Sequence, residues 1–183
     1  MKNKTFHVAL CGVIASLAVV IMLSTALVPI ATYAAPALAG VIMAVLVIEI
    51  NKKWALAAYF TASIISILIV PDKEAVALFV LFFGYYPVLK QLIESHIQKK
   101  LLQLLLKVFC FSVAAITSYF IAIGILGISA EEFDIFGVNL PILFLFVGII
   151  IFIIFDNALS GVIVTYVNKL RDKLFGKFIK KSS

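Results

Sequence analysis

Apolar stretches of about 20 residues alternate with short polar segments along the 183-residue chain. A membrane-spanning helix needs about 20 predominantly apolar residues, because the hydrocarbon core of a bilayer is about 30 Å thick. The pattern therefore predicts spanning helices near residues 6–28, 33–50, 54–70, 75–95, 104–128 and 139–168. Asn139 followed by Pro141 is typical of a helix start. We expect an all-α membrane protein, a bundle of six transmembrane helices in a single domain, residues 1–183, with a basic tail over 169–183.

Composition supports this fold class. The chain is 64% hydrophobic and only 13% charged, with a mean hydropathy of +1.22, a profile typical of integral membrane proteins. The net charge of +6 does not indicate nucleic-acid binding, because the basic residues lie between apolar stretches rather than on one helix face. The first apolar stretch is too long for a signal peptide, so we expect it to be retained as a helix.

The basic residues also predict an orientation. If the N-terminus is cytoplasmic, every Lys and Arg except Lys73 falls in a cytoplasmic segment, whereas Asp72, Glu74 and Asp134 fall outside. The positive-inside rule then places both termini in the cytoplasm. We expect a multi-pass protein of the inner or plasma membrane. Residues 90–107 allow two interpretations, an amphipathic connector along the inner membrane surface or two helix ends whose lysines reach the interface.

Catalytic patterns are absent from the sequence. His7 and His96 are the only histidines, both near cytoplasmic ends, and no HExxH, CxxC or glycine-rich phosphate loop occurs. Ser160 beside Gly161 has no histidine base within the membrane. We therefore expect no catalytic residue, no metal, no cofactor and no enzymatic activity.

Small residues recur at helical spacing in the first three predicted helices. Cys11 with Ala15, and Gly12 with Ser16, are each four residues apart, a spacing that puts small side chains on one helix face and allows close backbone approach. Two interpretations remain open: packing within this bundle, or a surface that docks another membrane protein.

The outer ends of the predicted helices carry aromatic, acidic and amide side chains. Such a mixture can bind a small polar molecule, although it also fits ordinary loop solvation. The candidate ligand-binding residues are Tyr33, Asp72, Tyr119, Phe133, Asp134 and Asn139.

Three charges of mixed sign fall at a similar depth inside predicted spans. Asp156 follows the apolar run 149–155, and a charge at the centre of a membrane helix costs about 2.5–3.5 kcal/mol or more. Counting 1.5 Å per residue from the outer end of each span puts Glu49, Lys90 and Asp156 at a similar depth, roughly 22 Å down. We expect Lys90 to pair with Asp156, Glu49 or both. Asp156 is then half of a structural charge pair, or part of a face that repacks when a partner docks, and a ligand belongs nearer Asn139.

The whole layout resembles a known family. The segments that carry the resemblance are "ALCGVIASLAVV" with "VPIATYAAPALAGVIMAVL", "LFFGYYPVLKQLIE" and "FDNALSGVIVTYVNKLRDKL". Together they resemble an S component, the substrate-binding membrane subunit of energy-coupling factor (ECF) transporters for vitamins and other micronutrients. Members of that family usually carry AxxxA on the first helix, where this chain has Cys11–Ala15 and Gly12–Ser16.

The resemblance implies a function that relies on partners. A prokaryotic S component captures a micronutrient at the outer face under a lid from the first loop. Its first three helices bind a transmembrane coupling subunit, and two ATPase subunits drive the protein to topple in the lipid bilayer. No motif here identifies the micronutrient. The alternative is a non-transporting six-helix membrane protein that acts as an assembly, immunity or interaction partner.

Overall fold

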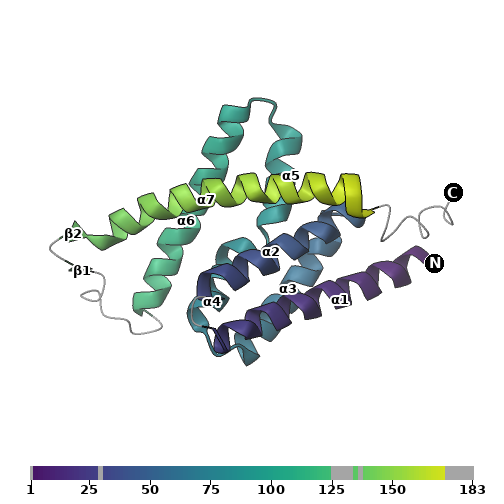
Figure 1. Ribbon diagram of the computed structural model, residues 1–183, viewed down its shortest axis with the longest axis horizontal. Coiled ribbons are helices and arrows are strands. Elements are labelled where there is room, and N and C mark those ends of the chain that lie inside the picture. The colour runs from purple at the N-terminus through teal and green to yellow at the C-terminus, as the bar shows by residue number, and fades with distance from the viewer. Residues whose placement is uncertain (1, 29–30, 125–133, 136–137, 172–183) are drawn as a thin grey trace.

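The computed structural model describes residues 2–28, 31–124, 134–135 and 138–171, and these residues are almost entirely helical (Figure 1). The helices run in the order α1 (Lys2–Leu23), α2 (Ala31–Glu49), α3 (Lys52–Ile69), α4 (Lys73–Leu78), α5 (Tyr86–His96), α6 (Lys100–Gly124) and α7 (Leu140–Thr165). Short turns of other pitch extend them at η1 (Ser24–Ala26), η2 (Phe79–Phe83) and η4 (Tyr166–Leu170). Strands β1 (Asp134–Ile135) and β2 (Val138–Asn139) pair antiparallel before α7.

Six helical segments of the described chain are long and apolar enough to cross a membrane. They are Lys4–Ala26, Ala31–Glu49, Lys52–Ile69, Lys73–His96, Lys100–Ser118 and Leu145–Lys169. Large apolar side chains such as Phe60, Leu68, Phe109 and Ile150 are exposed on their outer faces, as expected of helices surrounded by lipid. The prediction of a six-helix membrane protein is therefore confirmed at the level of helix number and class.

The helix boundaries follow local capping. The Asn51 side chain accepts hydrogen bonds from the backbone N–H groups of Lys53 and Trp54, at 3.0 and 3.2 Å, and so begins α3. Asp72 caps α4 in the same way, with 3.0 Å from Ala75 N to its Oδ1. α7 begins at Leu140, directly after Asn139, as the sequence predicts.

The fourth span departs from the regular helix expected over 75–95. It consists of α4, the π-helical turn η2 and α5, with a break at Gly84 and Tyr85. Gly84 N donates to Phe79 O over 2.8 Å, a five-residue bond that widens the helix, and Pro87, in the first turn of α5, has no N–H to donate. Tyr59 of α3 donates its hydroxyl proton to Val80 O over 2.6 Å, so α3 stabilises the widened turn.

The described helices pack around two hydrophobic clusters. The larger joins α1, α2 and α3 with α4 through small residues, among them Ala15, Ala39 and Ala58. The smaller joins α2, η2, α5, α6 and α7 through aromatic rings, and the rings of Phe111 and Phe152 stack with centroids 4.9 Å apart. α2 contributes to both clusters, and it therefore connects the α1–α3 group to the later helices.

The helices α5 and α6 form a hairpin that turns at residues 97–99 (Figure 1). α7 passes across both of them, and its last turn lies on the same side of the view as the start of α1. α6 starts at Lys100, four residues before the predicted start of the fifth helix, and it crosses α7 at a steep angle in this view. The segment 90–107 is therefore two helix ends joined by a tight turn, rather than one amphipathic connector.

Candidate functional site

The Asp156 carboxylate lies at a point where three helices meet. Tyr86 of α5 donates its hydroxyl proton to Asp156 Oδ1 over 2.6 Å, and Lys107 Nζ of α6 lies 3.0 Å from Oδ2. Lys90 of α5 forms an ion pair with Asp156 Oδ1. All four side chains are buried. The carboxylate on α7 thus receives one hydroxyl and two ammonium groups from the α5–α6 hairpin.

A second carboxylate completes this network. Glu94 Oε1 lies 2.9 Å from Lys90 Nζ and 2.6 Å from Lys107 Nζ, so each lysine contacts both acids. Two positive and two negative groups make the network neutral overall. Buried charges in a medium of low dielectric constant are tolerated when they are paired and hydrogen-bonded. Glu94 is the one accessible member, with 40% of its side chain exposed, whereas each lysine side chain is 4% exposed.

Helix geometry explains how α5 presents three of these groups together. Tyr86, Lys90 and Glu94 are spaced four residues apart and therefore lie on one face of the helix. The turn at 97–99 reverses the chain and brings Lys107 back beside that face. Asp156 then approaches from α7, which crosses the hairpin (Figure 1).

Only part of this arrangement follows from the sequence. Lys90 contacts Asp156, one of the two carboxylates expected beside it. Lys107 and Glu94 are not among the predicted partners of Asp156, because both interpretations of the 90–107 segment put its charges at the membrane surface. The spacing of Tyr86, Lys90 and Glu94 was a usable signal, since a polar row of this kind within a membrane-spanning segment faces protein rather than lipid.

Glu49 lies outside the network, contrary to the expectation that it shares the depth of Lys90 and Asp156. It accepts hydrogen bonds from Tyr166 over 3.3 Å and from Arg171 over 3.1 Å. Those residues follow Asp156 by 10 and 15 positions on the same helical segment, so Glu49 is displaced toward the end of α7. Residues at equal distances from the ends of their helices do not share one depth here, because the helices are not parallel (Figure 1).

Two of the candidate ligand-binding residues lie at one corner of the molecule. Thr32 donates to Asp72 Oδ2 over 2.7 Å, and Tyr33 donates to Glu74 Oε1 over 2.8 Å. These bonds join the start of α2 to the start of α4. The Tyr33 side chain remains largely exposed.

The other four candidate ligand-binding residues are described only in part. Asp134 pairs with Asn139 across the β1–β2 ladder, so the backbone brings these two residues opposite each other. Phe133 and the side chains of Tyr119, Asp134 and Asn139 lie outside the described part of the structure. The proximity of Tyr33 to Asp72 is thus the part of the expected outer site for which the structure gives side-chain contacts.

The small residues of α1 divide between two faces. Cys11 and Ala15 are buried, and Cys11 Sγ lies 3.6 Å from the Trp54 carbonyl oxygen of α3. These two residues therefore pack inside the protein and do not form a docking surface. Gly12 and Ser16 are exposed, and no atom lies within 4 Å of the position that a Cβ on Gly12 would occupy.

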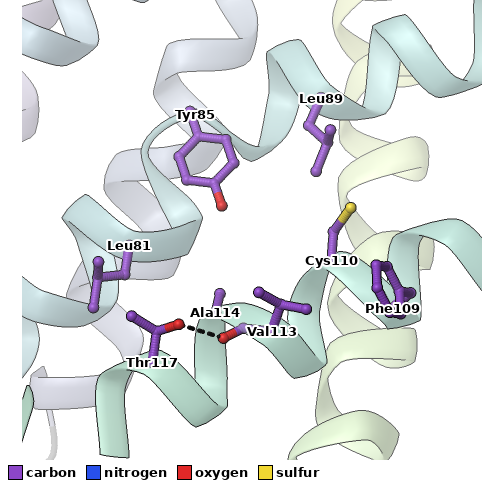
Figure 2. A pocket seen from close by; sticks show the side chains of 8 residues that line it. All are labelled: Leu81, Tyr85, Leu89, Phe109, Cys110, Val113, Ala114 and Thr117. Atoms are coloured by element: carbon purple, nitrogen blue, oxygen red, sulfur yellow. Dashed lines mark hydrogen bonds between the residues drawn. The ribbon is translucent and has the colours of Figure 1, made fainter. Parts of the chain in front are cut away.

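An open groove of about 390 Å³ lies between the fourth span and α6 (Figure 2). Leu81, Tyr85 and Leu89 line one wall, facing Cys110, Val113 and Thr117 on the other (Figure 2). Phe109 and Ala114 complete the lining. The lining is mainly apolar, and Thr117 satisfies its own hydroxyl by donating to Val113 O over 2.8 Å.

The fold and these contacts define a multi-pass helical membrane protein with a neutral, buried charge network. Comparison of the chain with protein-family models, with curated proteins and with solved structures finds no match.

Proposed function

We propose that this chain is the membrane-embedded substrate-binding subunit of an ECF-type importer, with both termini cytoplasmic in a prokaryotic cell membrane. In this role it captures a small micronutrient at the outer face, and a transmembrane coupling subunit with ATPase subunits supplies the energy. The layout of the six helices and the resemblance of the segments described above support this function.

The single observation that carries the proposal is the free face of α1. Gly12 and Ser16 are exposed there, while Cys11 and Ala15 hold α1 against the rest of the α1–α3 group. Small residues four positions apart let a partner helix approach the backbone closely, which is how helices associate in lipid without a hydrophobic driving force. A coupling subunit can use such a face without disturbing the buried face.

The outer corner supports ligand capture as well. The bonds of Tyr33 to Glu74 and of Thr32 to Asp72 join α2 to α4 next to the segment that follows α1. A ligand that replaces one of these hydrogen bonds would move the starts of α2 and α4 farther apart or closer together. The ligand would thereby couple its own binding to the arrangement of the α1–α3 group.

The test uses protein purified from native membranes in mild detergent. Mass spectrometry is expected to find a coupling subunit, ATPase subunits and one small molecule in the preparation. Gly12→Leu fills the free face of α1 and should reduce the recovered coupling subunit at least about tenfold, because tight backbone approach is lost. Val13→Leu is the matched control, since Val13 is exposed on the same helix and already carries a branched side chain.

This experiment distinguishes binding of the coupling subunit from binding of the small molecule. Gly12→Leu should keep the small molecule, because Gly12 lies 11 residues, about 16 Å, before the end of α1 that leads to the outer corner. Recovery of the wild-type protein with no partner proteins and no small molecule would contradict the proposal.

A second candidate function is a non-transporting membrane protein that acts as an assembly, immunity or interaction partner. It is favoured by one observation: Asp72 and Glu74 at the outer corner are already bonded within the protein. Recovery of a partner protein without ATPase subunits and without a small molecule would favour this second function.

A further inference from the structure

The groove between the fourth span and α6 opens at the apolar surface that the protein presents to lipid. Phe109 and Val113 at its edge are exposed by 64% and 49%, respectively. Its lining is apolar apart from the Tyr85 and Thr117 hydroxyls and the Cys110 thiol, and no residue of the charge network lines it. Whatever fills the groove in the membrane is therefore apolar along most of its length.

The size of the groove decides between two apolar occupants. Along α6 it extends from Phe109 to Thr117, about 12 Å at 1.5 Å per residue. A partner helix would need a contact along most of the 30 Å core, more than twice that length. The groove instead suits a slender hydrocarbon chain.

The position of Lys99 suggests which lipid carries that chain. Lys99 is exposed at the turn of the hairpin. Its carbonyl oxygen accepts a hydrogen bond from the Gln103 N–H over 3.1 Å, so Lys99 continues the helical geometry of α6 at its N-terminal end. Thr117 is 18 residues later, which is five turns at 3.6 residues per turn, so both lie on one face of α6. Lys100 lies seven residues before the buried Lys107, and so on the face toward the charge network.

The distances along this face match one leaflet. Lys99 is 11 residues from Cys110, about 16 Å, and half of a bilayer including the headgroups is about 20–22 Å thick. A headgroup at Lys99 therefore allows the acyl chain to pass Leu102 and reach the groove from the same leaflet. An exposed lysine at this level attracts anionic headgroups.

We propose that this groove binds an acyl chain of an anionic phospholipid whose headgroup contacts Lys99. The site lies in the leaflet at the hairpin turn, on the same side of the membrane as the start of α1 and the end of α7. The inference is independent of the proposed transport function, because it uses neither the outer corner nor the free face of α1.

Native mass spectrometry of the full chain tests the headgroup. The protein in neutral detergent is mixed with equal amounts of phosphatidylglycerol and phosphatidylcholine, and the retained lipids are counted. Phosphatidylglycerol should be retained preferentially. Lys99→Ala should reduce that preference about fivefold, the effect expected of one lysine at an anionic surface. Lys100→Ala removes the same charge from the other face and should leave the preference unchanged.

The acyl chain is tested in the groove itself. The chain has two cysteines, Cys110 in the groove and Cys11 in the α1–α3 core, so Cys11→Ala leaves a single reporter thiol. Phosphatidylglycerol should slow alkylation of Cys110 by an apolar maleimide. Thr117→Phe partly fills the groove and should abolish this protection, whereas Ile116→Phe at the neighbouring exposed position should retain it.

Several results would overturn the proposal. Equal retention of the two lipids, equal effects of Lys99→Ala and Lys100→Ala, or equal behaviour of Thr117→Phe and Ile116→Phe would each do so. Cys110 could also be protected in native membranes by a co-purifying protein. If removal of that protein abolishes the protection and added lipid does not restore it, the groove binds that protein instead. Variants are compared only after their helical circular dichroism is shown to match the parent.

Discussion

Tyr86 donates a hydrogen bond of 2.6 Å to Asp156, although 70 residues separate the two in the chain. The bond joins α5 to α7 inside the same network in which Lys90 and Lys107 contact the carboxylate. Because the network is neutral as a whole but charged in each member, removal of any one member leaves an uncompensated charge in a buried place. Substitutions of Asp156, Lys107 and Glu94 should therefore show this charge imbalance, whereas Tyr86 contributes through its hydrogen bond.

Asp156→Ala should destabilise the folded protein by about 3–5 kcal/mol, the cost of breaking a buried ion pair from one side. The expected measurement is reversible unfolding in mixed micelles, followed by circular dichroism. Asn157→Ala changes the adjacent exposed residue and should cost less than about 0.5 kcal/mol. Equal effects of the two substitutions would show that Asp156 does not stabilise the α5–α6–α7 junction.

Lys107→Met and Glu94→Gln should compensate each other. Each single substitution leaves the network with a net charge of one unit, whereas the double variant is neutral again and retains the Lys90–Asp156 pair. In a double-mutant cycle of unfolding free energies, we expect a coupling of about 0.5–3 kcal/mol. Strict additivity would mean that Glu94, which is partly exposed, is screened by water and does not stabilise Lys107.

Tyr86→Phe should cost about 1.5–3 kcal/mol, the range for a hydrogen bond to a charged group, because it removes the hydroxyl and retains the ring. Tyr85→Phe is the matched control at the neighbouring position, where the hydroxyl faces the groove (Figure 2). Its effect on unfolding should be small. If Tyr85→Phe costs as much as Tyr86→Phe, the bond to Asp156 is not the reason for the loss.

Gly40→Ala should destabilise the protein by about 1–3 kcal/mol through overpacking. A Cβ at Gly40 would clash with the Phe83 carbonyl oxygen, so α2 or the π-helical turn η2 has to move. Gly12→Ala meets no atom within 4 Å and should be neutral or slightly stabilising, because alanine favours helix over glycine. Unfolding of the two variants in the same micelles measures the difference.

The orientation of the chain predicts opposite accessibility of two turns. In a variant with both native cysteines replaced by alanine, Gln98→Cys at the hairpin turn should be labelled by an impermeant maleimide only after the cells are opened. Pro71→Cys, between α3 and α4, should be labelled in intact cells. The reverse pattern would place the termini outside.

The sequence by itself determined the fold class, the number of helices and most of their boundaries. Apolar length and capping residues such as Asn51 act within one segment, so they can be read without knowledge of the neighbours. It also indicated that Asp156 needs a partner, because an isolated charge in lipid is costly at any position in the fold. Lys90 was identified among its possible partners for the same reason.

Only the tertiary structure decided which charges meet. Lys107 reaches Asp156 because the chain reverses at 97–99. Glu49 pairs with Arg171 instead of Lys90, because the helices are tilted differently and residues equally far from their helix ends therefore lie at different depths. The two small-residue rows of α1 look equivalent in the sequence, yet α3 covers Cys11 and leaves Gly12 free. The periodicity of the sequence indicates which residues share a face of a helix, whereas packing against other helices determines which face is covered.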